Sequence, residues 1–137
     1  MRRLAPNETH AIEVDPRSLY YPSDIEIASG ERYRFSASGQ WKDLFIKCGP
    51  EGWHGLILQA WNRVPWQPFF LLCGSVGQSM DHAFVIGREL PEWSAPDNLP
   101  ASQDRQLYFF ANDWLSQYHN NHLVPDNPLR VVITRLF

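Results

Sequence analysis

Short apolar segments separated by turn residues run the whole length of this sequence, and this feature restricts the fold more than any other. Turn signals recur about every eight to twelve residues, eleven prolines interrupt the chain, and no long stretch has the period of a helix. This spacing is typical of a β-sandwich or jelly roll, and not of a parallel sheet, whose strands alternate with helices. We therefore predict an all-β fold, an antiparallel β-sandwich with at most one short helix.

Alternation and apolar runs indicate where the strands lie. Residues 24–28 and 31–37 alternate apolar and polar side chains on either side of Gly30, which predicts a hairpin with one face in the core. Short apolar runs predict further strands at residues 44–46, 55–61, 69–73, 82–86, 106–110 and 129–136.

The chain length suits one domain with a sizeable core, since it has 137 residues of which 44% are hydrophobic. We expect residues 1–10 to form a flexible N-terminal tail and residues 11–137 to form a single β-sandwich binding domain. The one candidate for a helix spans residues 113–118, where Asp113 would be the N-cap.

Charge and hydropathy argue against two classes of partner. The net charge of −3 and scattered basic residues give no electrostatic footprint for nucleic acid. No apolar run approaches the length of a membrane span, so we expect no membrane insertion. Residues 1–6 lack the apolar segment of a secretory signal, which predicts a cytoplasmic location, with non-classical release left open. Cys48 and Cys73 lie in or beside strands and are interpreted as buried free thiols, because a disulfide would need an oxidising compartment.

The most specific chemical pattern is a polar loop between the last two apolar strands. It carries two acids and four amides: Asn112, Asp113, Asn120, Asn121, Asp126 and Asn127. Calcium takes about six to eight oxygen ligands, and carboxylates and amides also bind sugar hydroxyls. Each of these residues is also a common turn residue, and Asp113 alone would serve equally well in an Asx turn.

Aromatic and histidine side chains near the polar loops are further candidates. Sugars pack their C–H faces on aromatic rings, so we expect Trp53 and Trp114 to border a site, whereas Trp41 and Trp93 are expected in or near the core. His54 lies in a loop with two glycines, where it would bond a ligand hydroxyl or simply face solvent.

Several of these segments, in this order, resemble the bacterial calcium-dependent galactose-binding lectins of the PA-IL type. The resemblance covers about residues 11–136 and rests on five segments: 36–41 (SASGQW), 47–52 (KCGPEG), 69–77 (FFLLCGSVG), 93–98 (WSAPDN) and 107–113 (LYFFAND). It implies a galactose-binding-like β-sandwich that binds sugar through a bridging calcium ion.

The resemblance also implies a ligand set. Asp113 matches the aspartate that contacts both calcium and sugar, and Asn120 and Asn121 match the family's Asn-Asn pair. Gln117 and Asp43 fall where backbone carbonyl ligands are contributed. His54 is a loose match to a histidine that contacts the sugar.

One departure from the family leaves two alignments open. Residues 122–128 (HLVPDNP) are inserted between the Asn pair and the last strand. Either Asn120 and Asn121 are the calcium ligands and the insertion loops out, or Asp126 and Asn127 are the equivalent pair.

The leading hypothesis is a lectin-like carbohydrate-binding module, calcium-dependent and galactose-type, which is not an enzyme and which gains avidity as a homo-oligomer. Its sugar-binding residues would be Asp113, Trp114, His54, Trp53 and Asn120. A second hypothesis is a calcium-free protein-interaction module on the same fold, with a degenerate sugar site and a binding surface around Trp61 and Trp66. A third is an enzyme with a transition metal held by His119, His122 and Asp113.

Overall fold

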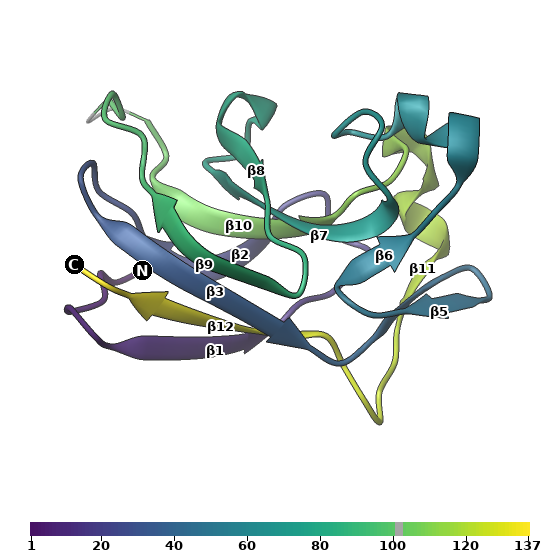
Figure 1. Cartoon of the computed structure of the whole chain (residues 1–137), viewed down its shortest axis with the longest axis horizontal. Coiled ribbons are helices and arrows are strands. Elements are labelled where there is room, and N and C mark those ends of the chain that lie inside the picture. Colours follow the sequence, from purple (N-terminus) through teal and green to yellow (C-terminus); the bar gives the residue numbers. More distant parts are fainter. Residues whose placement is uncertain (101–102) are drawn as a thin grey trace.

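Two antiparallel sheets pack face to face in the computed structural model, which describes residues 1–100 and 103–137 (Figure 1). The first sheet has the strand order β1 (Thr9–Glu13), β12 (Arg130–Arg135), β3 (Arg32–Ser38) and β9 (Glu89–Ser94). The second has the order β2 (Tyr21–Glu26), β10 (Gln106–Ala111), β7 (Phe69–Val76) and β6 (Glu51–Trp53), with β8 (Ala83–Val85) also paired to β7. The prediction of an antiparallel β-sandwich is confirmed.

A third, smaller sheet and three 3₁₀ helices complete the described chain. The small sheet has the order β11 (Asn121–Leu123), β4 (Trp41–Asp43) and β5 (Ile46–Cys48). The 3₁₀ helices are η1 (Leu56–Trp61), η2 (Met80–His82) and η3 (Leu115–Asn120). The expectation of at most one short helix was therefore too low, and the candidate at residues 113–118 begins two residues later, with Trp114 at its N-cap position.

The core lies between the two large sheets and follows the alternation of the sequence. Tyr33, Phe35 and Ala37 of β3 are buried while the residues between them face outward or are half-buried. Every residue of β7 is buried, because its outer face is covered as well. There the Arg63 guanidinium lies 3.9 Å from the centre of the Phe110 ring. The loop after η1 is thereby anchored on the outside of the second sheet.

Three predicted elements were wrong. Leu44 and Phe45, expected in a strand at residues 44–46, form the turn between β4 and β5, and Leu44 has a positive φ of 56°. The segments around Gly30 do not form a hairpin, because β2 pairs with β10 in one sheet while β3 pairs with β12 and β9 in the other. Alternation predicts which face of a strand is buried, but not which strand lies beside it. Residues 55–61 form η1 instead of a strand, because the Gln59 side chain accepts from Gly55 N–H and donates to Trp66 O, which closes a compact loop.

Residues 1–10, expected to be a flexible tail, are packed on the sandwich. Leu4 is buried in the core, Arg2 forms a bridge with Ile25, and β1 already begins at Thr9. This packing could not be predicted from the sequence, because one buried leucine among polar residues does not make a periodic pattern.

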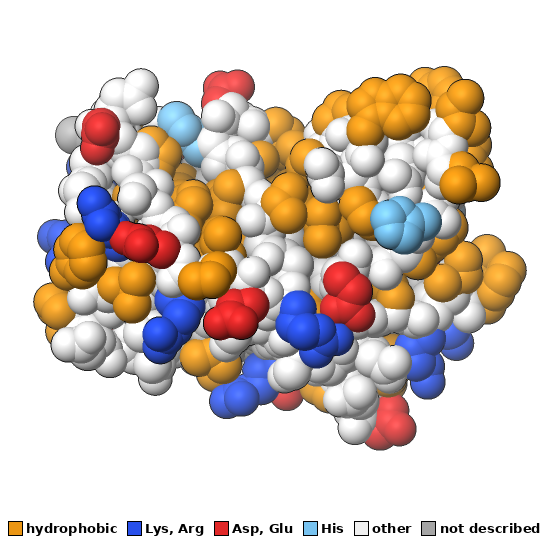
Figure 2. All heavy atoms as spheres, in the orientation of Figure 1, with side chains coloured by type: hydrophobic (Ala, Val, Ile, Leu, Met, Phe, Trp, Pro, Cys, Tyr) orange, Lys and Arg blue, Asp and Glu red, His pale blue; other side chains and the backbone are white. Residues whose placement is uncertain are grey.

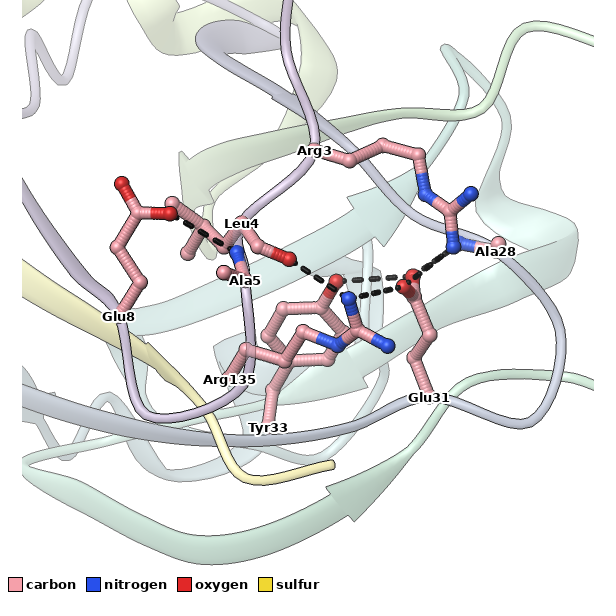
Figure 3. A network of polar contacts seen from close by, with 8 residues as sticks. All are labelled: Arg3, Leu4, Ala5, Glu8, Ala28, Glu31, Tyr33 and Arg135. Carbon is pink, nitrogen blue, oxygen red and sulfur yellow. Dashed lines mark hydrogen bonds and ion pairs between the residues drawn. The ribbon is translucent and has the colours of Figure 1, made fainter.

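Glu31 attaches this N-terminal segment to the sheets (Figure 3). Its carboxylate is only 3% exposed and accepts from Arg3, Tyr33 and Ala28 N–H, and it forms an ion pair with Arg135 at 3.2 Å. Burial acts to raise the pKa of Glu31, but the hydrogen bonds from Arg3, Ala28 and Tyr33 outweigh it and hold the pKa below its usual value. The carboxylate is therefore ionised and fully paired.

The two cysteines are free thiols, as predicted. Cys73 is buried and Cys48 is half-buried, and burial raises the pKa of each thiol to about 12. In the part of the chain that the structure describes, no helix has the length and apolar character needed to cross a membrane.

Glu31→Gln is expected to lower the free energy of unfolding by roughly 2–4 kcal/mol at pH 7, because it leaves Arg135 with an uncompensated charge in a mostly buried position. The Arg32–Glu92 pair is exposed on both sides, so the control Glu92→Gln should cost less than about 1 kcal/mol. Urea denaturation measures both. Because the folded pKa of Glu31 is depressed, the difference should shrink as the pH falls below its ordinary value of 4.5. Equal costs for the two variants would contradict this role.

Candidate functional site

A small pocket at one end of the sandwich collects polar and aromatic side chains from distant parts of the sequence. It has a volume of about 180 Å³. Its lining residues are Asp43, Trp53, Leu58, Phe69, Asp113, Trp114, Gln117 and Asn120. The sequence predicts that the loop after β10, the end of β4 and the strand of Trp53 contribute to one site. In the structure these three segments line the same pocket.

Asn112 fixes the loop on which Asp113 lies. Its side-chain oxygen accepts from Val64 N–H at 2.8 Å, and its side-chain nitrogen donates toward the carbonyls of Val64, Gln67 and Pro68 at 3.1, 3.3 and 3.1 Å. Every polar group of this buried amide is thus used within the protein. Asn112 is a positioning residue and not an oxygen ligand, although the sequence groups it with the candidate ligands.

The helix η3 and strand β11 return the chain to the same pocket. Asn121 is the cross-strand partner of Asp43, and Leu44 N–H donates to Asn120 O at 3.0 Å. The ligand candidates after β10 are therefore held against the end of β4 by main-chain hydrogen bonds.

Three buried side-chain oxygens at this site accept no hydrogen bond from any residue that the structure describes. They are Asp113 Oδ2 and Asn120 Oδ1, on residues that line the pocket, and Asn121 Oδ1, on the next residue, which is not among the lining residues. The amide nitrogens are occupied, since Asn121 Nδ2 donates to Pro16 O at 2.8 Å and Asn120 Nδ2 donates to Gln117 Oε1 at 2.9 Å. Each amide is therefore oriented by its donor, and the group left over is an oxygen. A buried acceptor without a donor costs about 1–3 kcal/mol.

The pocket holds two carboxyl groups, those of Asp43 and Asp113. Burial and the charge of Asp43 raise the pKa of Asp113, whereas the hydrogen bond from Trp114 N–H and the nearby Asn121 side chain lower it, and the resulting pKa is about 7. Burial also raises the pKa of Asp43. Among the described lining residues none is Lys, Arg or His. Two carboxylates in this setting favour a cation.

The donor set fits calcium. All the candidate ligands are hard oxygens from carboxylates and amides, which calcium prefers, and neither sulfur nor imidazole nitrogen lines the pocket within the described residues. The buried indole N–H of Trp53 makes no hydrogen bond to a described residue, although it lies close enough to Asp43 to offset part of the rise in that carboxyl's pKa. Among the described lining residues it is the one buried side-chain donor without a partner.

Other predicted residues lie outside this pocket. His54 is exposed and does not line it. Asp126 and Asn127 are exposed in the turn between β11 and β12, away from η1 and η3 (Figure 1), where Asn127 Nδ2 donates to Gln40 Oε1 at 3.3 Å. His119 and His122 are exposed, and no three His, Cys, Asp or Glu side chains of the described chain form a metal-binding group. The transition-metal hypothesis therefore has no geometric support.

Sequence reasoning missed Leu58 and Phe69, which were assigned to strands. The Phe69 ring stacks on Trp53 at 4.6 Å between ring centres and lies 6.0 Å from Trp114, so it forms the middle of the aromatic wall. Gly55 makes this possible, because a side chain there would collide with the Phe69 ring. The glycines on either side of Trp53 and His54 were the signal that a ring packs closely against this loop.

Comparison with known proteins relates the fold to a lectin. The solved structure of the EclA N-terminal domain, described as a PllA-like lectin, matches with a TM-score of 0.62 and 20% sequence identity, over 91% of this chain and 94% of that chain. No family model matches the sequence, and no curated protein matches it significantly. The likeness at this identity establishes a shared lectin-like β-sandwich fold.

The uncompensated charge of Asp113 predicts that Asp113→Asn stabilises the metal-free protein. The folded pKa is about 7 and the ordinary value is 3.8, so wild-type stability should fall as the pH rises from about 4 to 7, and the variant should escape this loss. A rise of one pKa unit equals about 1.4 kcal/mol, and we expect a gain on the order of 2–4 kcal/mol at pH 8.

Urea denaturation in EDTA at pH 4 and pH 8 measures this difference, with Asp126→Asn as a control at an exposed carboxylate. The control should stay within about 0.5 kcal/mol of wild type at both pH values. If the stability of Asp113→Asn relative to wild type does not increase between pH 4 and pH 8, the ionised Asp113 carboxylate does not destabilise the metal-free protein and the prediction is wrong.

Proposed function

We propose that this protein is a calcium-dependent carbohydrate-binding module that recognises galactose-type sugars. The observation that carries the proposal is the set of three buried oxygens without donors, on Asp113, Asn120 and Asn121, beside a second carboxylate at Asp43. The lectin-like fold of the solved relative supports the same class of function.

Residues at and beside the pocket would hold the calcium ion to which the sugar binds. Side-chain oxygens of Asp113, Asn120 and Asn121 would hold the ion, and Asp43 and Gln117 border the same pocket. When bound, calcium supplies the positive charge to which two vicinal sugar hydroxyls coordinate.

The rest of the sugar would meet the aromatic wall. Asp113 would accept hydrogen bonds from the coordinated hydroxyls, and such charge-assisted bonds are about twice as strong as neutral ones. The indole N–H of Trp53 is available to a sugar oxygen. The rings of Trp53 and Trp114 would cover an apolar sugar face. A pocket of about 180 Å³ is smaller than ordinary ligand pockets, so single-site binding should be weak, with a homo-oligomer adding avidity.

Isothermal calorimetry with methyl galactosides tests this function. We expect heat of binding in calcium, none in EDTA, and none for Asp113→Ala in calcium, because the variant loses the one carboxylate that serves both ion and sugar. Asp126→Asn is the control and should bind like wild type. Absence of calcium-dependent heat in the wild type, over a panel that also contains mannose, fucose and glucose, would overturn the proposal, and heat with another sugar alone would correct its specificity.

The two alignments of the Asn pair are separated by a matched pair of amide variants. Asn120→Ala removes an unpaired oxygen at the pocket and should weaken calcium binding by roughly 10–100-fold. Asn127→Ala removes an exposed amide at the distant turn and should leave calcium affinity unchanged. Calcium titration followed by tryptophan fluorescence measures both, and a larger loss in Asn127→Ala would favour the other alignment.

A second candidate function is a calcium-free protein-interaction module. It is favoured by the exposure of Trp61 and Trp66, which are 67% and 63% exposed, and by the apolar surface at one corner of the molecule (Figure 2). The two functions differ in the role of Asp113, since protein binding on the apolar surface would not depend on calcium.

A further inference from the structure

Arg63, in the loop after η1, connects the segments that carry and support the candidate calcium ligands. Its Nη1 donates to Leu19 O at 2.7 Å and to Tyr118 Oη at 3.0 Å. The Tyr118 hydroxyl in turn donates to Ala111 O, at the end of β10. One guanidinium therefore links the loop between β1 and β2, the helix η3 and the end of β10, which are far apart in the sequence.

The candidate ligands lie next to the residues held by these hydrogen bonds. Asp113 comes two residues after Ala111. Asn120 belongs to η3 itself, and Asn121 N–H donates to Tyr118 O where that helix ends. The position of η3 relative to the end of β10 therefore determines how closely the ligand oxygens of the two segments approach one another.

The loop between β1 and β2 and the main chain of Arg63 add two further links. Pro16 O accepts from Asn121 Nδ2 at 2.8 Å, so the loop that receives the guanidinium also orients a candidate ligand. Arg63 N–H donates to Asp113 O at 3.1 Å. Because a substitution at position 63 keeps this main-chain hydrogen bond, it tests the guanidinium alone.

The surroundings of Arg63 indicate a role for the hydrogen bonds that it donates. The ion pairs among the described residues do not include Arg63. Its guanidinium carbon lies 4.6, 3.9 and 5.4 Å from the ring centres of Tyr20, Phe110 and Tyr118, and its buried Nε has no partner in the described chain. Contacts with the rings offset only part of the cost of an unpaired donor and a partly desolvated cation. A long apolar side chain would pack on the same rings without that cost, so the hydrogen bonds to Leu19 and Tyr118 are what an arginine adds here.

We propose that Arg63 is a positioning residue for the calcium site: its guanidinium holds η3 against the end of β10 and so brings the ligand oxygens of Asn120 and Asp113 together. The proposal rests on the proposed function and adds to it a residue that does not line the sugar pocket. Residues that orient metal ligands without contacting the metal typically change metal affinity by about 10–100-fold when they are replaced.

Arg63→Met tests this role, because methionine can still pack on the three rings but has no hydrogen-bond donor. Calcium titration followed by tryptophan fluorescence should show an affinity reduced about tenfold. Methyl galactoside affinity, measured by calorimetry at saturating calcium, should be unchanged, since the guanidinium would contact neither the ion nor the sugar. Tyr118→Phe removes the hydroxyl between Arg63 and Ala111 and should give a similar loss of calcium affinity. The double variant should lose little more than either single variant, because both interrupt the same chain of hydrogen bonds.

Arg135→Met is the matched control. Arg135 is also half-buried, donates to a main-chain carbonyl, Leu4 O, at 2.7 Å, and has a buried Nε without a partner in the described chain. It lies near the C-terminus, at the opposite end of the sandwich from β11 (Figure 1). This variant should lower the free energy of unfolding and leave calcium affinity unchanged. Urea denaturation at the temperature of the titration measures stability and verifies that each variant is folded when calcium is added.

The outcomes separate this inference from the proposed function. Unchanged calcium affinity in both Arg63→Met and Tyr118→Phe would overturn the positioning role and leave the calcium site standing. An equal loss in Arg135→Met would reveal a general effect of lost stability and would also overturn it, as would a loss of galactoside affinity with calcium affinity intact. If Arg63→Met does not fold, Tyr118→Phe decides the question, since it removes a single hydroxyl. If the wild type binds no calcium, the proposed function fails, and the role of Arg63 fails with it.

Discussion

The buried amide of Asn112 is the constraint on which the functional end of this molecule depends. Its side chain holds the 64–68 loop, and its main chain accepts from Phe70 N–H and donates to Leu71 O, so β10 and β7 stay aligned to their ends. Asp113 is the next residue, so the hydrogen bonds of Asn112 also fix its position. The position of the 64–68 loop and that of the Asp113 carboxylate therefore depend on one residue, and displacing Asn112 would disturb both.

Such a site is built at a cost in stability. Three acceptors lack donors, two carboxylates share a pocket without a cationic side chain among the described lining residues, and the neighbouring loops contain residues with positive φ. These features lower the stability of the ligand-free fold, and strain of this kind concentrates at functional sites. A cation that binds only the folded state would offset the cost by mass action. Stability is supplied elsewhere, by the aromatic core and by the fully paired carboxylate of Glu31.

The sequence predicts the fold class and part of the site, for physical reasons that differ. Alternation in β3 and the apolar runs of β7, β10 and β12 identify strands and their buried faces. Pairing partners could not be predicted, because β2 and β3 are adjacent in sequence but lie in opposite sheets. The residues around Asp113 were predictable from their oxygen chemistry, whereas the role of Asn112 was not, since an amide that binds an ion and one that binds a loop look the same in sequence. The 3₁₀ helix η1 could not be predicted, because residues 56–58 form an apolar run that also fits a strand.

The pairing of a polar cavity with an apolar one changes how selectivity would arise. A pocket of about 180 Å³ distinguishes sugars by the positions of their hydroxyls, but it buries too little surface for tight binding. The adjoining cavity between η1 and η3 has a volume of about 810 Å³, and its walls are mainly the apolar side chains of Leu58, Trp61, Trp114 and Leu115. Because Leu58 and Trp114 line both cavities, selectivity would depend on the positions of η1 and η3, which set the shapes of the sugar pocket and of the apolar cavity together.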